Sequence, residues 1–526
     1  MASPTQIDST LPARVTDELI ERLTALVVAD GSREPFTMSE VFTGAAIGAL
    51  PQSTPSDVVA AFATAREAQR QWAQRPLEER LAVFRRLHEL ILENNELLVD
   101  LIQSGTGKNR RMAFEESCDV PMVISHYLKS APKLLRSRRR GGPVPVVSNS
   151  VELHRPKGVI GVIAPWNFPF AMALSDAIPA LIAGNGVVLK PDNKTALAAL
   201  YGVELLRRAG APEGLFQVVC GQGPDVGPAL IDESDFVMFT GSSATGVTVG
   251  ERAGRNLIGC SLELGGKNPM IVLDDVDLDE AIPSAIFAVF ANAGQACMHI
   301  ERMYVHERIY DEFSRRFVAA AGALKLGATY DFEPDMGSLA SPDQLRRVSA
   351  HVEDARAKGA TVLCGGRERT DVGPAFYAPT ILTGVTPDMH LASAETFGPV
   401  VALFRYSSDD EAIRLANDTR YGLNASVWGK DLRRAARIGA QLEAGNVNVN
   451  DGFAASFASK GTPSGGWKAS GVGVRHGDAG LLKYTDTTNL ATLKQQVYNP
   501  RPGQSYEQYA QQTKQVLRWM RKLRIR

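Results

Sequence analysis

The feature that most constrains the fold is an alternation of short apolar runs with helical segments, which begins near residue 158. The stretch "GVIGVIAP" is typical of a buried strand, "FAMALSDAIPALIAG" of a helix closed by Gly184, and "GVVLKP" of the next strand. The series continues with the helix "TALAALYGVELLRRAG" and the strands "FQVVCG" and "DFVMFTG". Such alternation favours an α/β fold with a doubly wound parallel sheet. Ligands of such sheets bind at the carboxyl ends of the strands, so candidate site residues are sought there.

The rest of the chain divides into four further regions. A second α/β region is expected at about 265–465, where "NPMIVL", "VALFRY" and "GNVNVN" resemble strands. Residues 55–135 repeat apolar positions at helical spacing. Residues 1–36 are polar with one amphipathic stretch, and we expect an extension outside the main core. The segments 143–156 and 485–494 are expected to form an antiparallel ribbon for subunit pairing, with a solvent-exposed hairpin as the alternative.

Composition argues against several classes of protein. The chain has 526 residues, enough for two or three domains. Its net charge of −1 gives no bulk attraction to nucleic acid or a membrane, and no apolar run approaches the ~20 residues that span a bilayer. The N-terminus lacks the features of a secretory signal. The five cysteines are scattered and form no CxxC, and the histidines form no HExxH, so we expect a reducing, cytoplasmic compartment and no metal site.

Two basic stretches need an explanation. "RSRRRGG" (136–142) has the charge of a nucleic-acid contact, but a solvated charge run before a turn is the simpler interpretation. The tail "TKQVLRWMRKLRIR" (513–526) has six basic residues and no acidic one. We prefer packing of its apolar face on a neighbouring subunit, with an anionic membrane surface as the alternative. The apolar residues of that face are Val516, Trp519, Met520 and Leu523.

Two strand ends can contact a phosphorylated ligand. In "FTGSSATG" (239–246) a strand passes through a Gly-Ser turn into a helix, whose free N–H groups attract an anion such as a pyrophosphate. Simple chain punctuation is the alternative, and the GxGxxG fingerprint is absent. In "VLKPDN" Lys190 follows a strand and can reach a ribose or phosphate, although a solvated surface lysine is the commoner case.

Three further stretches carry groups suited to catalysis. Asn167, in "APWNFP", can donate a hydrogen bond to a developing oxyanion, and a structural turn asparagine is the alternative. Glu263, in "LELGGKNP", lies among apolar residues that raise a carboxyl pKa and suit a general base, unless it is salt-bridged. Cys297, in "ANAGQACMHIER", is either a nucleophile or one more buried thiol.

Taken together and in this order, the stretches resemble the aldehyde dehydrogenase superfamily from about residue 37 to residue 497. The resemblance depends on "PWNFP", "VVLKP", "FTGS", "LELGGKNP", "GQAC", "ETFGPV", "NDTRYGLNASVW" and "SGGWKASGVG". It implies a Rossmann-like cofactor domain (37–142 and 158–264), a catalytic domain (265–465) and an oligomerisation ribbon (143–157 and 484–497). A basic tail (498–526) follows. The implied assembly is a homodimer or homotetramer, with no nucleic-acid or membrane partner.

The resemblance also implies the roles of individual residues. Cys297 is the expected nucleophile, Asn167 stabilises the oxyanion together with the Cys297 N–H, and Glu263 activates the water that releases the carboxylate. Because CoA-acylating relatives lack that glutamate, hydrolysis of the thioester is expected. The expected contacts of the cofactor are Trp166, Lys190, Asn193, Gly241, Ser242, Gly246, Glu395 and Phe397.

Departures from the family pattern bear on the cofactor and the substrate. Asn193 replaces the glutamate that repels a 2′-phosphate in NAD-preferring members, so NADP is favoured and NAD is also possible. The run "TGSSATG…ELGGKNPMIV…NAGQAC" is similar to NADP-type succinate-semialdehyde dehydrogenases. However, Ser175 and Ala291 occupy the positions of the two arginines that bind the substrate carboxylate there. The pocket is therefore expected to be wider and less basic, with Phe168 and Met172 lining it and His299 or Arg475 as candidate cations.

The sequence thus predicts oxidation of an aldehyde such as succinic semialdehyde, with a broad-specificity aliphatic or aromatic aldehyde dehydrogenase as the alternative. A non-catalytic protein on the same fold is the alternative of a different class.

Overall fold

The computed structural model describes residues 11–141 and 147–522. A six-stranded sheet in the order β19-β9-β8-β5-β6-β7 forms the first domain, with β5 to β9 parallel and β19 antiparallel at the edge next to β9. The predicted doubly wound sheet is therefore confirmed. Its strands are β5 (Val159–Ile163), β6 (Gly186–Lys190), β7 (Phe216–Val218), β8 (Phe236–Thr240), β9 (Gly259–Glu263) and β19 (Gly471–Val472).

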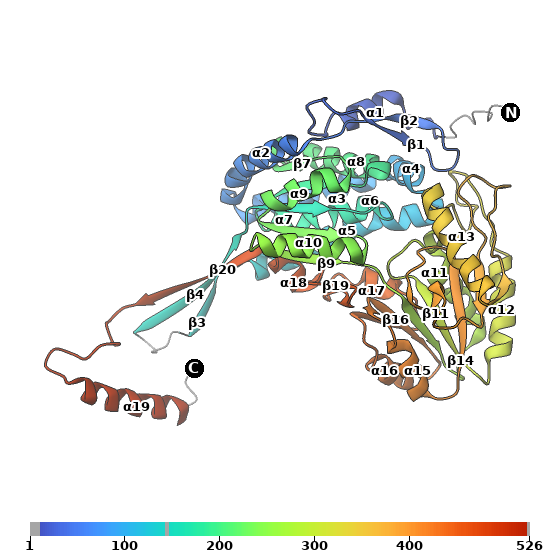
Figure 1. The fold of residues 1–526 in the computed structure, drawn as a ribbon. Coiled ribbons are helices and arrows are strands. Elements are labelled where there is room, and N and C mark those ends of the chain that lie inside the picture. Colours follow the sequence, from blue (N-terminus) through green and yellow to red (C-terminus); the bar gives the residue numbers. More distant parts are fainter. Residues whose placement is uncertain (1–10, 142–146, 523–526) are drawn as a thin grey trace.

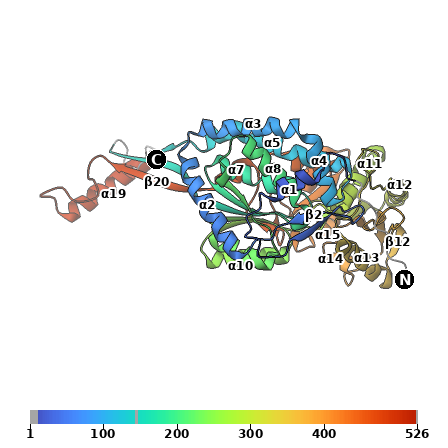
Figure 2. The same ribbon diagram turned by 90° about the horizontal axis from the view of Figure 1, so that it is seen from above.

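Helices cover both faces of this sheet, as Figure 2 shows from above. Neighbouring residues of one strand consequently point into different clusters of apolar side chains: Val187 and Leu189 pack with one helical layer, while Val188 packs with the other. Burial on both faces explains why the strands are continuous apolar runs. The connecting helices are α6 (Pro169–Leu174), α7 (Ala177–Ile182), α8 (Ala196–Arg208), α9 (Gly223–Glu233), α10 (Ser243–Arg255) and the 3₁₀ turns η1 (Asn193–Thr195) and η2 (Glu213–Leu215).

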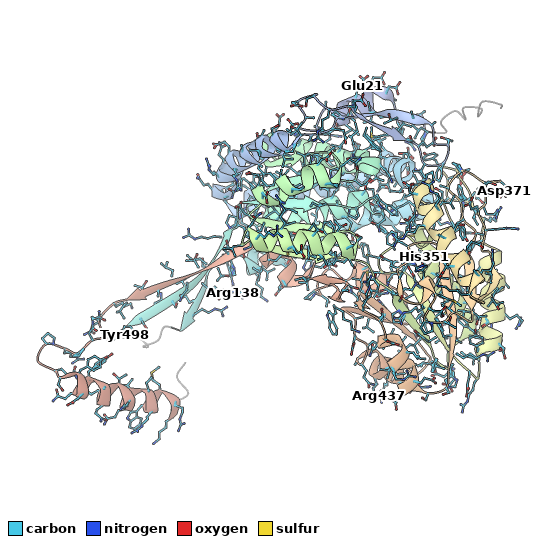
Figure 3. All side chains as sticks on the ribbon, in the orientation of Figure 1. Glu21, Arg138, His351, Asp371, Arg437 and Tyr498 are labelled. Carbon is cyan, nitrogen blue, oxygen red and sulfur yellow. The ribbon has the colours of Figure 1, made fainter. Side chains whose placement is uncertain are left out.

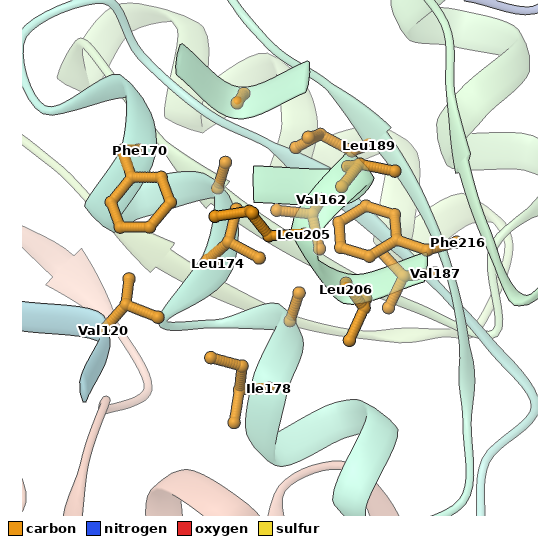
Figure 4. Close-up of a cluster of buried hydrophobic side chains, with 14 of the residues drawn as sticks. Val120, Val162, Phe170, Leu174, Ile178, Val187, Leu189, Leu205, Leu206 and Phe216 are labelled. Carbon is orange, nitrogen blue, oxygen red and sulfur yellow. The ribbon is translucent and has the colours of Figure 1, made fainter. Parts of the chain in front are cut away.

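Four helices lie between the N-terminal segment and the sheet in the chain, and the first of them packs onto β5, β6 and β7. The first of them begins at Thr54, which forms a capping box with Asp57 and so satisfies free backbone N–H groups. The largest core of the protein forms where these helices meet α6 to α8, with Val120, Phe170 and Leu205 among its buried side chains (Figure 4). The helices are α2 (Pro55–Gln74), α3 (Leu77–Glu93), α4 (Asn95–Thr106) and α5 (Arg110–Leu134).

The second domain contains a seven-stranded sheet in the order β12-β13-β14-β11-β10-β16-β17, in which β12 alone is antiparallel among the described strands. The strands are β10 (Asn268–Val272), β11 (Ile300–His306), β12 (Thr361–Cys364), β13 (Thr380–Thr383), β14 (Val400–Tyr406), β16 (Asn424–Trp428) and β17 (Asn446–Val449). The helices are α11 (Leu278–Phe290), α12 (Tyr310–Gly322), α13 (Pro342–Ala357), α14 (His390–Ser393), α15 (Asp409–Asn417), α16 (Leu432–Gly439) and α17 (Ala454–Ala458), with the 3₁₀ turn η3 (Ala291–Gly294). Two short strands, β15 (Tyr421–Gly422) and β18 (Trp467–Lys468), pair with each other, and α18 (Gly477–Leu482) packs on α5.

A three-stranded ribbon extends away from both domains (Figure 1). Its strands are β3 (Arg138–Gly141), β4 (Ser148–Pro156) and β20 (Thr485–Leu493). In the basic run at 136–142, Arg138–Gly141 forms a strand that pairs with β4, where the exposed Arg140 contacts Glu152. The turn expected after the run falls on residues 142–146, outside the described part of the chain. The ribbon therefore begins before residue 143, and the predicted residues 143–146 lie outside the described part of the chain. Figure 3 labels Arg138, where β3 begins, and Tyr498, in the segment that follows β20.

The N-terminal segment differs from its prediction. Helix α1 (Asp17–Thr24) buries Leu19, Ile20 and Leu23 in the main core, and the N–H of Val28 donates to the carbonyl of Val218 on β7. The amphipathic stretch thus covers apolar surface on α8, so residues 15–28 belong to the domain rather than outside it. A hairpin of β1 (Phe36–Ser39) and β2 (Ala46–Leu50) follows.

The C-terminal helix α19 (Tyr506–Lys522) buries none of its side chains, and Val516 and Trp519 are about half exposed. Met520 lies on the same helix, whereas Leu523 of the predicted face is outside the described residues. What covers this face stays a prediction. Within residues 11–141 and 147–522, every helix is too short or too polar to cross a bilayer.

Candidate active site

Cys297 follows a loop with an unusual backbone. Helix α11 ends at Phe290, and Asn292, Ala293 and Gly294 then have φ values of 52°, 52° and 69°. Three successive left-handed residues are rare, because the Cβ atom of an L-residue is crowded in this region. At Gly294 an added Cβ would lie only 2.0 Å from the carbonyl oxygen of Gly398. Glycine is therefore required at this position of the turn that precedes the thiol.

Side-chain amides fix the loop in place. Asn268 Nδ2 donates to the carbonyl oxygens of Cys297 (2.8 Å) and His299 (2.7 Å), and Asn424 Nδ2 donates to that of Met298 (2.8 Å). The Gln295 side chain accepts from the N–H of Ala340 (2.9 Å). The backbone around Cys297 is consequently held from both sides by buried groups.

Cys297 lines a cavity of about 300 Å³ between the two domains. Residues from the carboxyl ends of β8 and β9 line one side, and residues of the second domain line the other. The predicted site residues that line it are Cys297, Glu263, Asn167, Trp166, Phe168, Met172, Gly241, Ser242, Glu395 and Phe397. One cavity thus brings together the predicted nucleophile, base and oxyanion donor.

Asn167 lies just beyond β5, and hydrogen bonds hold both its side-chain amide and its backbone carbonyl. Its Nδ2 donates to the carbonyl of Gln295 (3.0 Å), which uses one of the two amide hydrogens. The backbone carbonyl of Asn167 accepts from Nζ of Lys108 (2.8 Å), a fully buried lysine paired with Glu116. The Glu116 carboxylate in turn accepts from the N–H of Phe170 at the start of α6. Sequence reasoning missed this support, because nothing in "GTGKNR" indicates a buried lysine.

Glu263 is the last residue of β9, beside Thr240 on β8 and Gly471 on β19. Burial raises its carboxyl pKa to about 7, although Arg475 and Lys483 act in the opposite direction. Its Oε1 accepts no hydrogen bond from the residues that the structure describes. A carboxyl group with a pKa near neutrality and a free oxygen is suited to accept a proton from water.

The surroundings of Cys297 disfavour the thiolate form of its side chain. Burial raises the pKa of Cys297 to about 12; the guanidinium of Arg475 lowers it, while Glu395 and Glu263 raise it further. Because the thiolate is the nucleophile, the thiol needs a proton acceptor and a nearby positive charge to react. Arg475, which also lines the cavity, supplies such a positive charge.

Glu395 and Phe397 lie on the opposite wall. Phe397 has a left-handed φ of 57° and is held by Glu301, which accepts from its N–H (3.0 Å), and by Gln344, which donates to its carbonyl (2.6 Å). The Phe397 ring meets Trp166 edge-on at 5.4 Å between centroids. Burial, and after it the charge of Glu301, raises the pKa of Glu395 to about 7.

The Gly-Ser turn begins α10 at the edge of the cavity. Ser242 caps the helix by accepting from the N–H of Thr245, and Gly241 and Ser242 both line the cavity. Gly246 lies behind them, where an added Cβ would meet Leu264 at 2.5 Å. The turn therefore presents a helix N-terminus to the cavity, the arrangement that binds a pyrophosphate.

Lys190 and Asn193 do not line the cavity, but they lie at the same edge of the sheet. Lys190 ends β6 opposite Ile163 of β5, and burial lowers the pKa of its ammonium group. Asn193 is buried: it donates to Gln52 Oε1 (2.9 Å) and accepts from the N–H of Gly221 (3.1 Å).

The structure differs from the prediction for the substrate end of the cavity. Ser175 is buried and donates to Asp119, and Ala291 packs against Met298, so neither lines the cavity. Bulky side chains from positions without a motif fill this wall instead of leaving it open. They are Met112, Met122, Phe287, Phe453 and Phe457.

The two candidate cations differ in position. His299 is buried beside Glu301, its Nδ1 faces the carbonyl of Ala296, and it does not line the cavity. Burial lowers the pKa of His299, so it is a poor source of positive charge. Arg475 lines the cavity and pairs with Asp176. Over the described part of the chain, no group of three or more His, Cys, Asp or Glu side chains is arranged to hold a metal ion.

Comparisons with known proteins agree with this geometry. Residues 27–490 match the sequence model of the Aldehyde dehydrogenase family. A Mycolicibacterium smegmatis protein named "Putative succinate-semialdehyde dehydrogenase", with NADP(+) in its name, is 51% identical over 90% of this chain and 92% of its own length. The 3-sulfolactaldehyde dehydrogenase of Pseudomonas putida is 36% identical over 88% and 94%.

The fold also matches that of a solved structure. The succinate-semialdehyde dehydrogenase of Burkholderia pseudomallei has a TM-score of 0.85 and 34% identity, over 89% of this chain and 96% of that one. The match to the family sequence model extends over most of the 526 residues, from just after α1 to strand β20 of the ribbon. The chain belongs to the aldehyde dehydrogenase family.

Proposed function

We propose that this aldehyde dehydrogenase uses Cys297, Asn167 and Glu263 to oxidise an aldehyde to a carboxylate by hydrolysis of a thioester. The observation that carries the proposal is the convergence of these three side chains on one cavity. The sulfur of Cys297 attacks the aldehyde carbon and forms a C–S bond. The amide of Asn167 and the backbone N–H of Cys297 stabilise the resulting oxyanion. Glu263 then accepts a proton from the water that attacks the thioester, which releases the carboxylate and restores the thiol.

A nicotinamide cofactor fits the opposite wall. The N-terminus of α10 faces the cavity at Gly241 and Ser242, and Glu395 and Phe397, the residues expected to contact the ribose and the nicotinamide ring, line the same cavity. When bound, the cofactor supplies the hydride acceptor for the carbon attached to Cys297.

NADP is the proposed cofactor, with NAD also accepted. The name of the Mycolicibacterium smegmatis relative includes NADP(+). The family resemblance supports the same choice, because NAD-preferring members carry at the position of Asn193 a glutamate that repels a 2′-phosphate. Asn193→Glu is expected to raise the KM for NADP at least tenfold while changing the KM for NAD little. Initial rates with both cofactors measure this, and an unchanged ratio of the two KM values would contradict the role of Asn193.

The proposed substrate is an aldehyde with a distal anionic group, such as succinic semialdehyde. The names of the relatives from Mycolicibacterium smegmatis and Pseudomonas putida support this class, since both name aldehydes that carry a negative charge. A second candidate is an apolar aliphatic or aromatic aldehyde. It is favoured by the aromatic wall of Phe287, Phe453 and Phe457.

A panel of aldehydes separates these candidates. Formation of reduced cofactor is followed with succinic semialdehyde, hexanal and benzaldehyde, using the wild-type protein and Cys297→Ala. A higher kcat/KM for succinic semialdehyde supports the anionic class, and a higher value for the neutral aldehydes supports the second candidate. Turnover that survives in Cys297→Ala would overturn the role of Cys297.

We also propose a cytoplasmic homodimer or homotetramer assembled through the ribbon. Leu490 and Leu493 on β20 are 52% and 40% exposed, and exposed apolar side chains on a projecting strand favour a subunit contact. The five cysteines of the chain are all free thiols, as expected in a reducing compartment. Leu490→Lys is expected to lower the assembled mass in sedimentation, whereas Leu432→Lys, an equally exposed leucine on α16, is expected to leave it unchanged.

A further inference from the structure

A buried ion pair lies at the cavity that the proposed catalytic groups line. Arg475 Nη2 is 2.9 Å from Asp176 Oδ2, and their side chains are 10% and 4% exposed. The two residues are distant in sequence: Asp176 precedes α7, and Arg475 follows β19 near the C-terminus. Such a pair costs desolvation energy and is weak evidence for stabilisation, so its position at the cavity calls for another explanation.

The guanidinium of Arg475 is held in one orientation. Besides Asp176, its Nη2 donates to Thr240 Oγ1 (2.6 Å), and Nη1 lies 3.1 Å from the sulfur of Met172. The backbone of Arg475 exchanges two hydrogen bonds with Ser464. The guanidinium is therefore fixed by Met172, Asp176 and Thr240, and the backbone of Arg475 is fixed by Ser464.

That orientation brings the positive charge to the proposed base. Thr240, which accepts from Arg475, is the direct neighbour of Glu263 on the adjacent strand. Arg475, Glu263 and Cys297 all line the same cavity. The carboxylates of Asp176 and Glu263 keep the guanidinium charged, although burial opposes this.

Removing Arg475 would change the balance of charge around the site. The ionisable groups that act on Glu263 are Arg475, Lys483 and Asp176: two cations and one anion. Lys483 lies behind β9, and its Nζ is 3.3 Å from Ser261 Oγ and 3.0 Å from the carbonyl of Val474. Glu395 is a further anion, which acts on Cys297 together with Arg475 and Glu263. Without Arg475 the one remaining cation would face the carboxylates of Asp176 and Glu395, which disfavours an anion at Glu263 or Cys297.

We propose that Arg475, oriented by Asp176 and Thr240, is a positioning residue whose fixed positive charge favours both the Glu263 carboxylate and the Cys297 thiolate. The inference rests on the proposed roles of these two residues. A purely structural ion pair would tie the C-terminal segment to α7 without affecting the reactivity of the thiol. The two explanations differ in how charge removal at either partner changes that reactivity.

The test measures alkylation of Cys297 by iodoacetamide at pH 8, with peptide mapping by mass spectrometry. It needs no aldehyde, so a wrong substrate assignment does not affect it. Arg475→Gln is expected to slow alkylation of Cys297 about tenfold, the effect of a pKa higher by about one unit. Asp176→Asn, which keeps the cation and removes the opposing charge, is expected to speed alkylation. Arg475→Lys is expected to remain within about threefold of wild type.

Two controls make the result specific. Arg110→Gln removes the cation of another buried Arg–Asp pair, with Asp100, and is expected to leave alkylation of Cys297 unchanged. Alkylation of Cys118 in the same samples reports general loosening of the structure. If Arg475→Gln does not fold, Asp176→Asn still tests the proposal, because removal of the opposing negative charge must then speed alkylation of Cys297.

The pH dependence of kcat gives a second readout. Its lower limb, assigned to Glu263, is expected to move to higher pH in Arg475→Gln and to lower pH in Asp176→Asn. Equal alkylation rates in Arg475→Gln and wild type, or changes of the same sign in both variants, would overturn the proposal.

Discussion

The side chain of Lys108 supports the backbone of Asn167: Nζ donates to the Asn167 carbonyl oxygen at 2.8 Å, across 59 positions of sequence. Burial lowers the pKa of Lys108, while Glu116 raises it. Lys108→Met would leave the Glu116 carboxylate buried and unpaired, which costs about 3–5 kcal/mol in comparable cases. We expect lower stability in urea unfolding and at least a tenfold loss of kcat, because Asn167 loses its support.

The double variant Lys108→Met/Glu116→Leu separates the two effects. Removing both charges is expected to restore most of the stability but not kcat. Recovery of both together would mean that Lys108 does not orient Asn167.

Glu263→Gln is expected to separate the two halves of the proposed reaction. The amide cannot accept a proton from water, so the thioester on Cys297 should form but hydrolyse slowly. Rapid mixing with aldehyde and NADP should show a burst of about one reduced cofactor per site, followed by a steady rate lowered about a hundredfold or more. Loss of the burst as well would place Glu263 in the first half of the reaction.

The same substitution has an effect on stability that depends on pH. The folded-state pKa of Glu263 is about 7, above the ordinary value of 4.5, so the folded protein holds this proton more tightly than the unfolded chain. The resulting stability is complete below pH about 4.5 and is lost as the pH rises to about 7, by about 3 kcal/mol in total. Glu263→Gln should avoid this loss. Urea unfolding at pH 5 and pH 8 should therefore show a stability advantage of Glu263→Gln over wild type that is larger at pH 8.

Gly294→Ala tests the turn before the nucleophile. The new Cβ would lie 2.0 Å from the Gly398 carbonyl at a φ of 69°, so the loop must shift. We expect a loss of about 2 kcal/mol or more and at least a tenfold drop in turnover. Gly359→Ala is the matched control, since Gly359 also has a positive φ but open space around it. Comparable losses of turnover in both variants would show that backbone strain alone, rather than the position of Cys297, is responsible.

Fold and site differ in how far the sequence predicts them. Strands β5 to β8 of the first sheet were predictable because residues such as Val187 and Val188 are buried on opposite faces, which leaves an uninterrupted apolar run. Strand β3 was not, because an exposed ribbon strand made of arginines has no apolar period. The place of Leu19 and Leu23 in the main core was also missed, since periodicity shows that a helix is amphipathic but not what covers it.

At the site, motif resemblance led to Cys297, Glu263 and Asn167, and one cavity contains all three. Pairings such as Lys108 with Glu116, or Asp176 with Arg475, were beyond reach, because no local pattern links charged residues that meet only after folding. The aromatic wall was missed for the same reason: Phe287 and Phe457 come from different helices and belong to no motif.

The antiparallel strand β19 makes the formation of this site depend on the order in which the chain is synthesised. Because Gly471 pairs with Glu263 and Arg475 follows a few residues later, the catalytic edge of the first sheet is completed by a segment made long after β9. Domains tend to fold as they leave the ribosome, N-terminal parts first. During synthesis β9 is therefore an open edge strand for some two hundred residues, and the reactive centre closes only when nearly the whole chain has emerged.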